Sequence, residues 1–147
     1  MLSIAIGCDP NAMELKYTII DYLNIKGYLV TDFGDEDPIY ANTAFCLATS
    51  VAANQYDRGI LICGTGIGMS IAANKVPGVY AAVVESVYSA KMSRLHNDSN
   101  VLCLGGRVLE PDKAWEILST WLETPFEGGR HARRVEKVKE IEKKFLK

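Results

Sequence analysis

Short apolar runs alternate along this chain with longer stretches in which apolar residues recur every three or four positions. The runs predict five β-strands, at residues 2–6, 28–32, 59–63, 79–84 and 101–104. The periodic stretches predict helices at residues 13–25, 41–53, 86–96 and 112–122, with a short helix over residues 69–73 and a charged helix that reaches Lys147. Strands that alternate with helices form βαβ units, so a five-stranded parallel sheet is expected. No linker or repeat divides the pattern, which predicts one domain over residues 1–147.

Composition narrows the class of protein. With 147 residues, 48% of them hydrophobic, the chain is long enough to bury a substantial core. A net charge of −2 gives no bulk attraction to nucleic acid or to an anionic membrane, and the longest apolar runs are far short of a membrane span. The N-terminus lacks the basic segment of a signal peptide, so a cytoplasmic protein is expected. The four cysteines show no CxxC spacing and are expected to be free thiols.

The third predicted strand ends in a loop with unusual chemistry. Cys63 closes the strand, and glycine then stands at every second position, as Gly64, Gly66 and Gly68. Glycine allows sharp turns and close approach to a ligand, and a loop that enters a helix directs free N–H groups at one spot, which favours an anion. A thiol beside such positive potential is a candidate thiolate. The loop therefore predicts an anion site with a nucleophile or base at its edge.

Further polar residues follow the other predicted strands. They are Cys8 and Asp9 after the first strand, Glu85 after the fourth, and Gly105-Gly106-Arg107 after the fifth. Ligands of open parallel sheets bind beyond the carboxyl ends of the strands. These residues are expected to lie near the Cys63 loop.

The C-terminal helix carries basic residues. At 100° per residue, Arg130 and Arg134 lie within about 40° of one another. Arg134 shares a face with the apolar residues Val138, Ile141 and Phe145, whereas Arg133 is expected to point away together with Lys137. Such a helix often packs on another subunit. The pattern thus predicts that the pair Arg130 and Arg134 is delivered to a site at a dimer interface.

Five segments together resemble one known family. They are residues 63–68 (CGTGIG), 72–78 (AANKVPG), 96–98 (HND), 105–107 (GGR) and 125–131 (PFEGGRH). In this order they resemble the ribose-5-phosphate isomerase B family, which also contains galactose-6-phosphate and allose-6-phosphate isomerases. The resemblance implies a Rossmann-like three-layer α/β/α sandwich with an extra C-terminal helix. It also implies a homodimer with active sites between subunits, and aldose–ketose isomerisation of a phosphorylated sugar without metal or cofactor.

Aldose–ketose isomerisation needs a base near C1 and C2, an anion hole for the enediolate, and a phosphate clamp. By resemblance, Cys63 is the base, and Thr65 and His96 open the furanose ring. The remaining residues that the resemblance assigns contact the substrate, its enediolate or its phosphate: Asp9, Gly64, Gly66, Ile67, Gly68, Ser70, Asn97, Arg107, Arg130 and Arg134. Guanidinium groups suit phosphate because they donate two parallel hydrogen bonds.

The chain departs from the family in two loops. The family usually has Asp-His after the first strand, and here Pro10 follows Asp9. The family also tends to carry a Tyr-Pro-Asp-Tyr segment after the second strand, where this chain has Asp37-Pro38-Ile39-Tyr40. Both changes fall where the sugar would be recognised. They weaken the case for ribose 5-phosphate itself and leave a six-carbon sugar phosphate or another pentose phosphate open.

Several residues have a structural interpretation beside the functional one. A cysteine at the end of a buried strand is commonly a core residue, and Cys46 and Cys103 are expected to be buried in the core. Cys8 is expected to line the pocket without acting. His131 caps the last helix or neighbours the phosphate, and both interpretations stay open.

Two other functions remain as alternatives. The glycine loop lacks the ending of a P-loop and the spacing of a dinucleotide fingerprint, although Glu85 lies about 20 residues on, where a ribose-binding acid is found. The first alternative is therefore a sugar-phosphate- or nucleotide-binding module without catalysis. The second is one subunit type of a hetero-oligomeric galactose-6-phosphate isomerase. Whether dimers pair into a tetramer is also left open.

Overall fold

The computed structural model describes residues 1–146. Its sheet is parallel throughout, as predicted, with the strand order β2-β1-β3-β5-β4. The strands are β1 (Ser3–Cys8), β2 (Leu29–Asp32), β3 (Arg58–Cys63), β4 (Ala81–Val83) and β5 (Val101–Gly105). The central strands are apolar on both faces, because helices cover both sides of the sheet.

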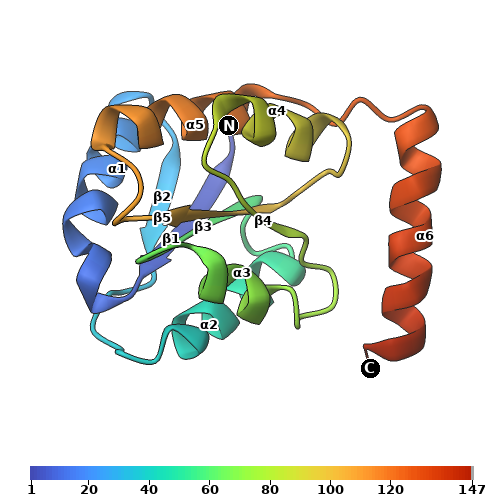
Figure 1. Ribbon diagram of the computed structural model, residues 1–147, viewed down its shortest axis with the longest axis horizontal. Coiled ribbons are helices and arrows are strands. Elements are labelled where there is room, and N and C mark those ends of the chain that lie inside the picture. The colour runs from blue at the N-terminus through green and yellow to red at the C-terminus, as the bar shows by residue number, and fades with distance from the viewer. Residues whose placement is uncertain (147) are drawn as a thin grey trace.

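The helices form two layers, one on each face of the sheet (Figure 1). One layer contains α1 (Met13–Ile25), α4 (Val87–Leu95) and α5 (Pro111–Glu123), and the other contains α2 (Tyr40–Ala52) and α3 (Ile67–Ala73). Their apolar faces form two cores, the larger around Trp121 in α5 and the smaller around Met69 in α3. A single 3₁₀ turn, η1 (Pro10–Ala12), joins β1 to α1. The predicted three-layer α/β/α sandwich is therefore confirmed.

The strand boundaries differ from the prediction by one or two residues, and two of the differences have a visible cause. Strand β1 continues through Gly7, where an added Cβ would stand 2.8 Å from the Thr43 methyl group, so this glycine permits close packing of α2 rather than ending the strand. Strand β4 begins only at Ala81, because the Tyr80 N–H donates to the side chain of Asn100 rather than to the ladder. The elements themselves are those that the hydrophobic pattern predicts.

The prediction that Cys46 is a core residue is wrong. Helix α2 buries Thr43, Ala44, Leu47, Ala48 and Val51, so position 46 falls on its opposite, exposed face. Cys103, in contrast, is fully buried in the central strand β5, as expected. All four cysteines are free thiols.

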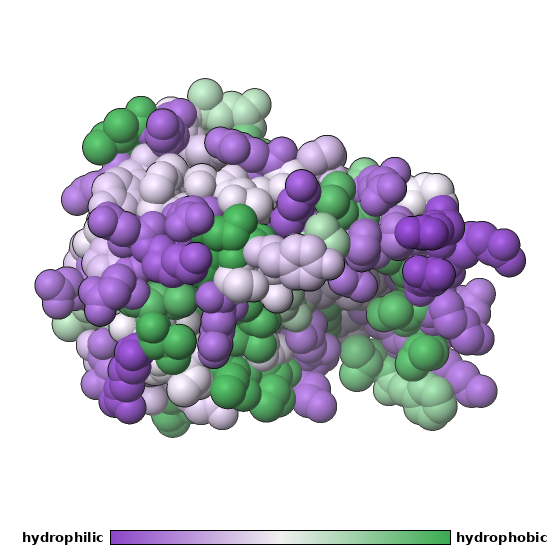
Figure 2. Space-filling view, turned by 45° about the horizontal axis from the view of Figure 1, so that its top comes forward, coloured by the Kyte–Doolittle hydropathy of each residue, from purple (hydrophilic) through white to green (hydrophobic). Residues whose placement is uncertain are grey.

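The last helix, α6 (Arg130–Phe145), stands beside the sandwich rather than within a layer (Figure 1). It ends at Phe145, before the predicted limit, and Lys147 itself lies outside the described residues. Of its residues, His131 and Val135 are buried. Its apolar residues Val138, Ile141 and Phe145 are more than half exposed, and Figure 2 shows hydrophobic side chains on α6 facing a hollow beside the body. Within residues 1–146 no helix combines the length and apolar character that crossing a membrane requires.

Candidate active site

The strand order creates a crevice at the carboxyl edge of the sheet. From β1 the chain moves outward to β2, and β3 then lies on the other side of β1. Connections that leave two neighbouring strands in opposite directions open a ligand crevice beyond their carboxyl ends. Asp9 follows β1 there, Cys63 ends β3, and Arg107 follows β5. The predicted grouping of these polar residues at one edge is confirmed.

Cys63 is held at the mouth of the glycine loop. Its side chain is buried, and its Sγ accepts a hydrogen bond from the Gly66 N–H at 3.2 Å. Gly66 has φ +82° and lies so close to Leu104 that an added Cβ would be 3.0 Å from its carbonyl carbon. Only glycine allows this turn. A backbone N–H aimed at sulfur binds a thiolate more strongly than a thiol, since bonds to ionised acceptors are the stronger ones.

The other buried cysteines differ from Cys63 in their surroundings. Burial raises the pKa of Cys8 to about 12, although Lys16 acts in the opposite direction. Burial also raises the pKa of Cys103. Both therefore remain neutral thiols at neutral pH. Cys63 differs from these two cysteines because a backbone N–H of the glycine loop donates a hydrogen bond to its sulfur.

Arg107 lies directly over the glycine loop. The Gly106 N–H donates to the Cys63 carbonyl at 2.8 Å, and the Arg107 N–H donates to the Gly64 carbonyl at 3.0 Å. An added Cβ at Gly64 would meet the Arg107 side chain at 3.5 Å. The guanidinium group thus stands beside the Cys63 loop, where an anionic ligand gains most from it.

Asp9 and Pro10 form a short cap at the same edge. The Asp9 carboxylate accepts the Asn11 N–H at 3.0 Å and caps η1. Pro10 occupies the first position of that turn, where a backbone N–H has no partner within the turn. Pro10 is therefore compatible with the local backbone. Compared with the histidine usual in the family, only the imidazole side chain is missing.

Tyr40, the last residue of the segment 37–40 that departs from the family, covers the far end of the loop. An added Cβ at Gly68 would be 2.7 Å from the Tyr40 ring, so glycine is required by this packing. The Ser70 hydroxyl donates to the Ile67 carbonyl, and the Ile67 N–H donates to the Thr65 hydroxyl. The sequence gave no signal for this contact, because Gly68 lies 28 positions after Tyr40.

His96 lies at the opposite edge of the sheet. Helix α4 begins at its Ser86 cap beyond the end of β4 and runs back, so that His96, its C-terminal cap, lies near the start of β5. Strand β5 has five residues, and at about 3.3 Å per residue it separates the two edges by about 15 Å. Within one chain, His96 and Asn97 are therefore not brought together with Cys63 and Thr65.

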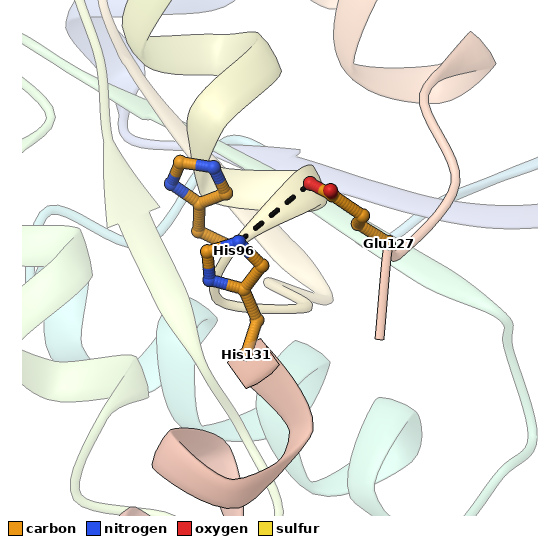
Figure 3. Close-up of side chains that lie close together, drawn as sticks. All are labelled: His96, Glu127 and His131. Carbon is orange, nitrogen blue, oxygen red and sulfur yellow. Dashed lines mark ion pairs between the residues drawn. The ribbon is translucent and has the colours of Figure 1, made fainter. Parts of the chain in front are cut away.

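The His96 imidazole stacks on that of His131 from α6, with ring centroids 4.0 Å apart and planes 14° apart (Figure 3). The two rings border a cavity of about 480 Å³ between α6 and the body. Asn97 and Arg134 line the same cavity, with Tyr80 and Val138. His131 thus lines this cavity beside Arg134, and its role as a neighbour of the phosphate stays a prediction.

The charges around His131 favour an anion over a cation. Burial lowers its pKa, and His96, Arg130 and Arg134 act in the same direction, while Glu127 acts against them. The Arg130 Nε donates to the His131 Nε2 at 3.5 Å, and Glu127 lies 3.6 Å from the same nitrogen. Ligand atoms of His96, Glu127 and His131 come within 4.8 Å of one another. Nearly parallel rings cannot direct their in-plane lone pairs at one metal ion, and two guanidinium groups would repel it.

The sequence pattern predicts that Arg133 and Lys137 point away from Arg134 and the apolar face. Neither lines the cavity with His96, but both lie closer to Arg130 and Arg134 than predicted. All four basic residues, namely Arg130, Arg133, Arg134 and Lys137, line one hollow of about 400 Å³. At 100° per residue Lys137 lies only about 20° from Arg130, and Arg133 lies about 60° from it. The basic face of α6 is therefore broader than the expected pair. Arg134 alone of the four also lines the cavity with His96.

Comparison with known proteins shows which family shares this sequence and fold. The model of a family described as Ribose/Galactose Isomerase matches residues 4–138. A D-erythrulose-4-phosphate isomerase of Pectobacterium atrosepticum is 50% identical over 142 residues, which cover 94% of this chain and 93% of that protein. The ribose-5-phosphate isomerase B of Escherichia coli is 46% identical over 147 residues, with 98% and 99% covered. The structure of a ribose-5-phosphate isomerase B from Clostridium thermocellum superposes with a TM-score of 0.94 at 50% identity, covering 98% of this chain and 99% of that one.

Proposed function

The chain belongs to the ribose/galactose isomerase family, and from this premise we propose that it interconverts ribose 5-phosphate and ribulose 5-phosphate through an enediolate. It is a sugar-phosphate isomerase of the type that exchanges an aldose for a ketose. The observation that carries the proposed chemistry is the Cys63 sulfur, held by the Gly66 N–H beneath Arg107 at the carboxyl edge. These groups supply a base, an N–H donor and a positive charge in one place.

In the proposed mechanism the Cys63 thiolate removes the proton from C2 of the open-chain aldose. The electrons of the broken C–H bond form the C1–C2 double bond, and the carbonyl oxygen becomes the enediolate oxygen. N–H groups of the loop from Gly64 to Ser70 stabilise this negative charge, as in other preorganised anion holes. The thiol then returns the proton to C1, and the proton on the C2 hydroxyl moves to the C1 oxygen, which gives the ketose.

The ring-opening pair of the proposal comes from two subunits. Thr65 lies in the Cys63 loop, whereas His96 lies at the other edge of the sheet, about 15 Å away. A homodimer joins the two groups when the amino edge of one subunit faces the Cys63 crevice of its partner. The exposed apolar residues of α6, and Ile67 and Ile71 on α3, supply surface for such an interface.

Arg134 is expected to bind the phosphate group. Arg134→Ala should raise KM by about 10- to 150-fold, the usual cost of one hydrogen bond to a charged group, with little change in kcat. Lys137→Ala is the matched control, because Lys137 lines the basic hollow but pairs with Glu140 at 3.3 Å and does not line the His96 cavity. We expect this control to change KM by less than about threefold. Steady-state kinetics with ribose 5-phosphate measure both KM values. Equal effects from both variants would contradict the assignment of Arg134 to phosphate binding.

A second candidate substrate is a four-carbon ketose phosphate. It is favoured by the 50% identity to a protein named D-erythrulose-4-phosphate isomerase and by Pro10 in place of the histidine usual in the family. Purified chain should therefore be assayed on ribose 5-phosphate, erythrulose 4-phosphate, and allose and galactose 6-phosphates. Turnover of galactose 6-phosphate only after addition of a second subunit type would support the hetero-oligomeric alternative.

The same assay tests the effect of Pro10. Pro10→His should raise kcat/KM for ribose 5-phosphate by about 10- to 150-fold if the missing imidazole costs one hydrogen bond to a charged group. Pro10→Ala serves as control, since it removes the proline ring without adding a donor. Ordinary efficiency of the natural chain on ribose 5-phosphate, with no gain in Pro10→His, would show that the proline is neutral.

A further inference from the structure

Glu142 ties the far end of α6 to the body of the protein. Its Oε1 accepts a short hydrogen bond of 2.6 Å from the Gly78 N–H, and its Oε2 accepts one of 2.9 Å from the Tyr80 hydroxyl. The two donors precede strand β4, more than 60 positions earlier in the chain. Both carboxylate oxygens are thus engaged by one segment of the body.

The segment that receives Glu142 is shaped for it. Gly78 has φ +90°, a conformation that suits glycine, and its carbonyl accepts the Asn100 side chain at 2.9 Å. Asn100 also accepts the Tyr80 N–H at 2.8 Å, so the same side chain holds both ends of the turn. Gly78 ends the run of residues 72–78, which belongs to the motifs of this chain but lies outside the Cys63 loop.

Tyr80 places this contact at the site. It lines the cavity of about 480 Å³ together with His96 and Arg134. Glu142 follows Arg134 by eight residues, which is about 12 Å along a helix. Helix α6 therefore contacts the body through the stack of His131 on His96 near its start and through Glu142 near its end, with residues that line the cavity between them.

Apolar packing covers little of this half of α6 among the described residues. Beyond Val135 the residues of α6 are half-buried or exposed, and Val138 and Ile141 are each 51% exposed. Burial and the bond to Glu142 raise the pKa of Tyr80 to about 12, so its hydroxyl remains a donor at neutral pH. A charged acceptor with two donors is the strongest polar link that this half of the helix makes among the described residues.

We infer that Glu142 is a positioning residue of the isomerase: by binding the Gly78 N–H and the Tyr80 hydroxyl, it sets the angle of α6 and so places Arg134 on the His96 cavity. This inference rests on the proposed function. Glu142 touches neither the substrate nor the reacting atoms, and it acts through the helix. Its loss is expected to weaken phosphate binding while leaving the chemical step at Cys63 intact.

The test compares Glu142→Ala, Glu142→Gln and Tyr80→Phe with the control Glu140→Ala. Glu140 is exposed on the same helix and pairs only with Lys137 among the described residues. Glu142→Ala should raise KM for ribose 5-phosphate about tenfold or more, with kcat changed less than about threefold. Glu142→Gln should recover most of this loss, because an amide can still accept from Gly78 and donate to the Tyr80 oxygen. Glu140→Ala should match the wild type.

A double variant identifies the bond itself. Tyr80→Phe should raise KM by a smaller factor than Glu142→Ala, and the two changes combined should be no worse than Glu142→Ala alone, because both break one link. Amide hydrogen exchange over residues 130–145 should be faster in Glu142→Ala, with the melting temperature of the sandwich unchanged. If Glu142→Ala does not fold, the KM of Tyr80→Phe tests the role of the bond between Tyr80 and Glu142.

Unchanged KM in Glu142→Ala, or in Tyr80→Phe where only that variant folds, would overturn the inference. A wild-type chain that isomerises no sugar phosphate would instead refute the proposed function. In that case the exchange measurement still tests the link, and unaltered exchange of α6 would overturn it as well.

Discussion

Cys63→Ala is expected to lower kcat for isomerisation by about 10²–10⁴ while the protein remains folded, because the change removes the proposed base for the C2 proton. The fold should tolerate the change, since Cys63 lies at the end of β3 and alanine keeps the β3–β5 pairing, so that only the hydrogen bond from the Gly66 N–H to the sulfur is lost. Cys63→Ser should be nearly as inactive, because a hydroxyl is a much poorer base than a thiol at neutral pH. Circular dichroism and initial rates on each variant provide the measurement.

Two further observations isolate the role of the thiol. Cys46→Ala is the matched control, because Cys46 is exposed on α2 and should be replaceable without loss of rate. Wild-type turnover in D₂O should place deuterium at the transferred position, as proton transfer requires and a hydride shift does not. A loss below tenfold in Cys63→Ala would contradict the assignment. Sugar-phosphate binding without any turnover in the wild type would favour the non-catalytic module.

The sandwich was predictable because its signals are local. Apolar runs such as residues 59–63 and the periodicity of α1 and α5 are properties of short windows, and the βαβ order then limits the topology. The errors arose where contacts between distant elements decide the outcome. Cys46 directly precedes the buried residues Leu47 and Ala48 of α2, so its apolar character alone did not show that it lies on the exposed face. Lys16 is fully buried in α1, where it pairs with Asp32 and Asp35, and no periodicity indicates a buried lysine.

The part of the site that lies at strand ends was predictable, because the strand ends themselves could be predicted from the sequence. Asp9, Cys63 and Arg107 meet at one edge because parallel strands end there. Tyr40, His131 and Glu142 could not be placed, since their partners depend on the path of the segment over residues 124–129 and of the loop that precedes α2. The basic hollow spans a wider arc of α6 than the predicted pair of arginines, so that it also includes Arg133.

Because the proposed site residues lie in two groups at opposite edges of the sheet, we expect mixed dimers of two inactive variants to recover activity. His96 and Arg134 line one cavity at the amino edge, while Cys63 lies at the carboxyl edge. One chain would carry Cys63→Ala, and the other would carry His96→Ala with Arg134→Ala. Each homodimer should be nearly inactive. In a mixed dimer, one site receives an intact Cys63 from the second chain and an intact His96 and Arg134 from the first.

Random pairing makes about half of the dimers mixed, and each mixed dimer has one intact site of two, so about a quarter of wild-type activity should return after joint refolding. Differently tagged chains allow the mixed dimer to be purified, and its activity should then be about half that of the wild type. A control mixture of Cys63→Ala with Cys63→Ser should recover nothing, because neither chain supplies the thiol. Proven mixed dimers without recovered activity would mean that each site is built within a single chain. The two edges of the sheet are about 15 Å apart, and no side chain spans that distance. This separation argues against a site built within a single chain.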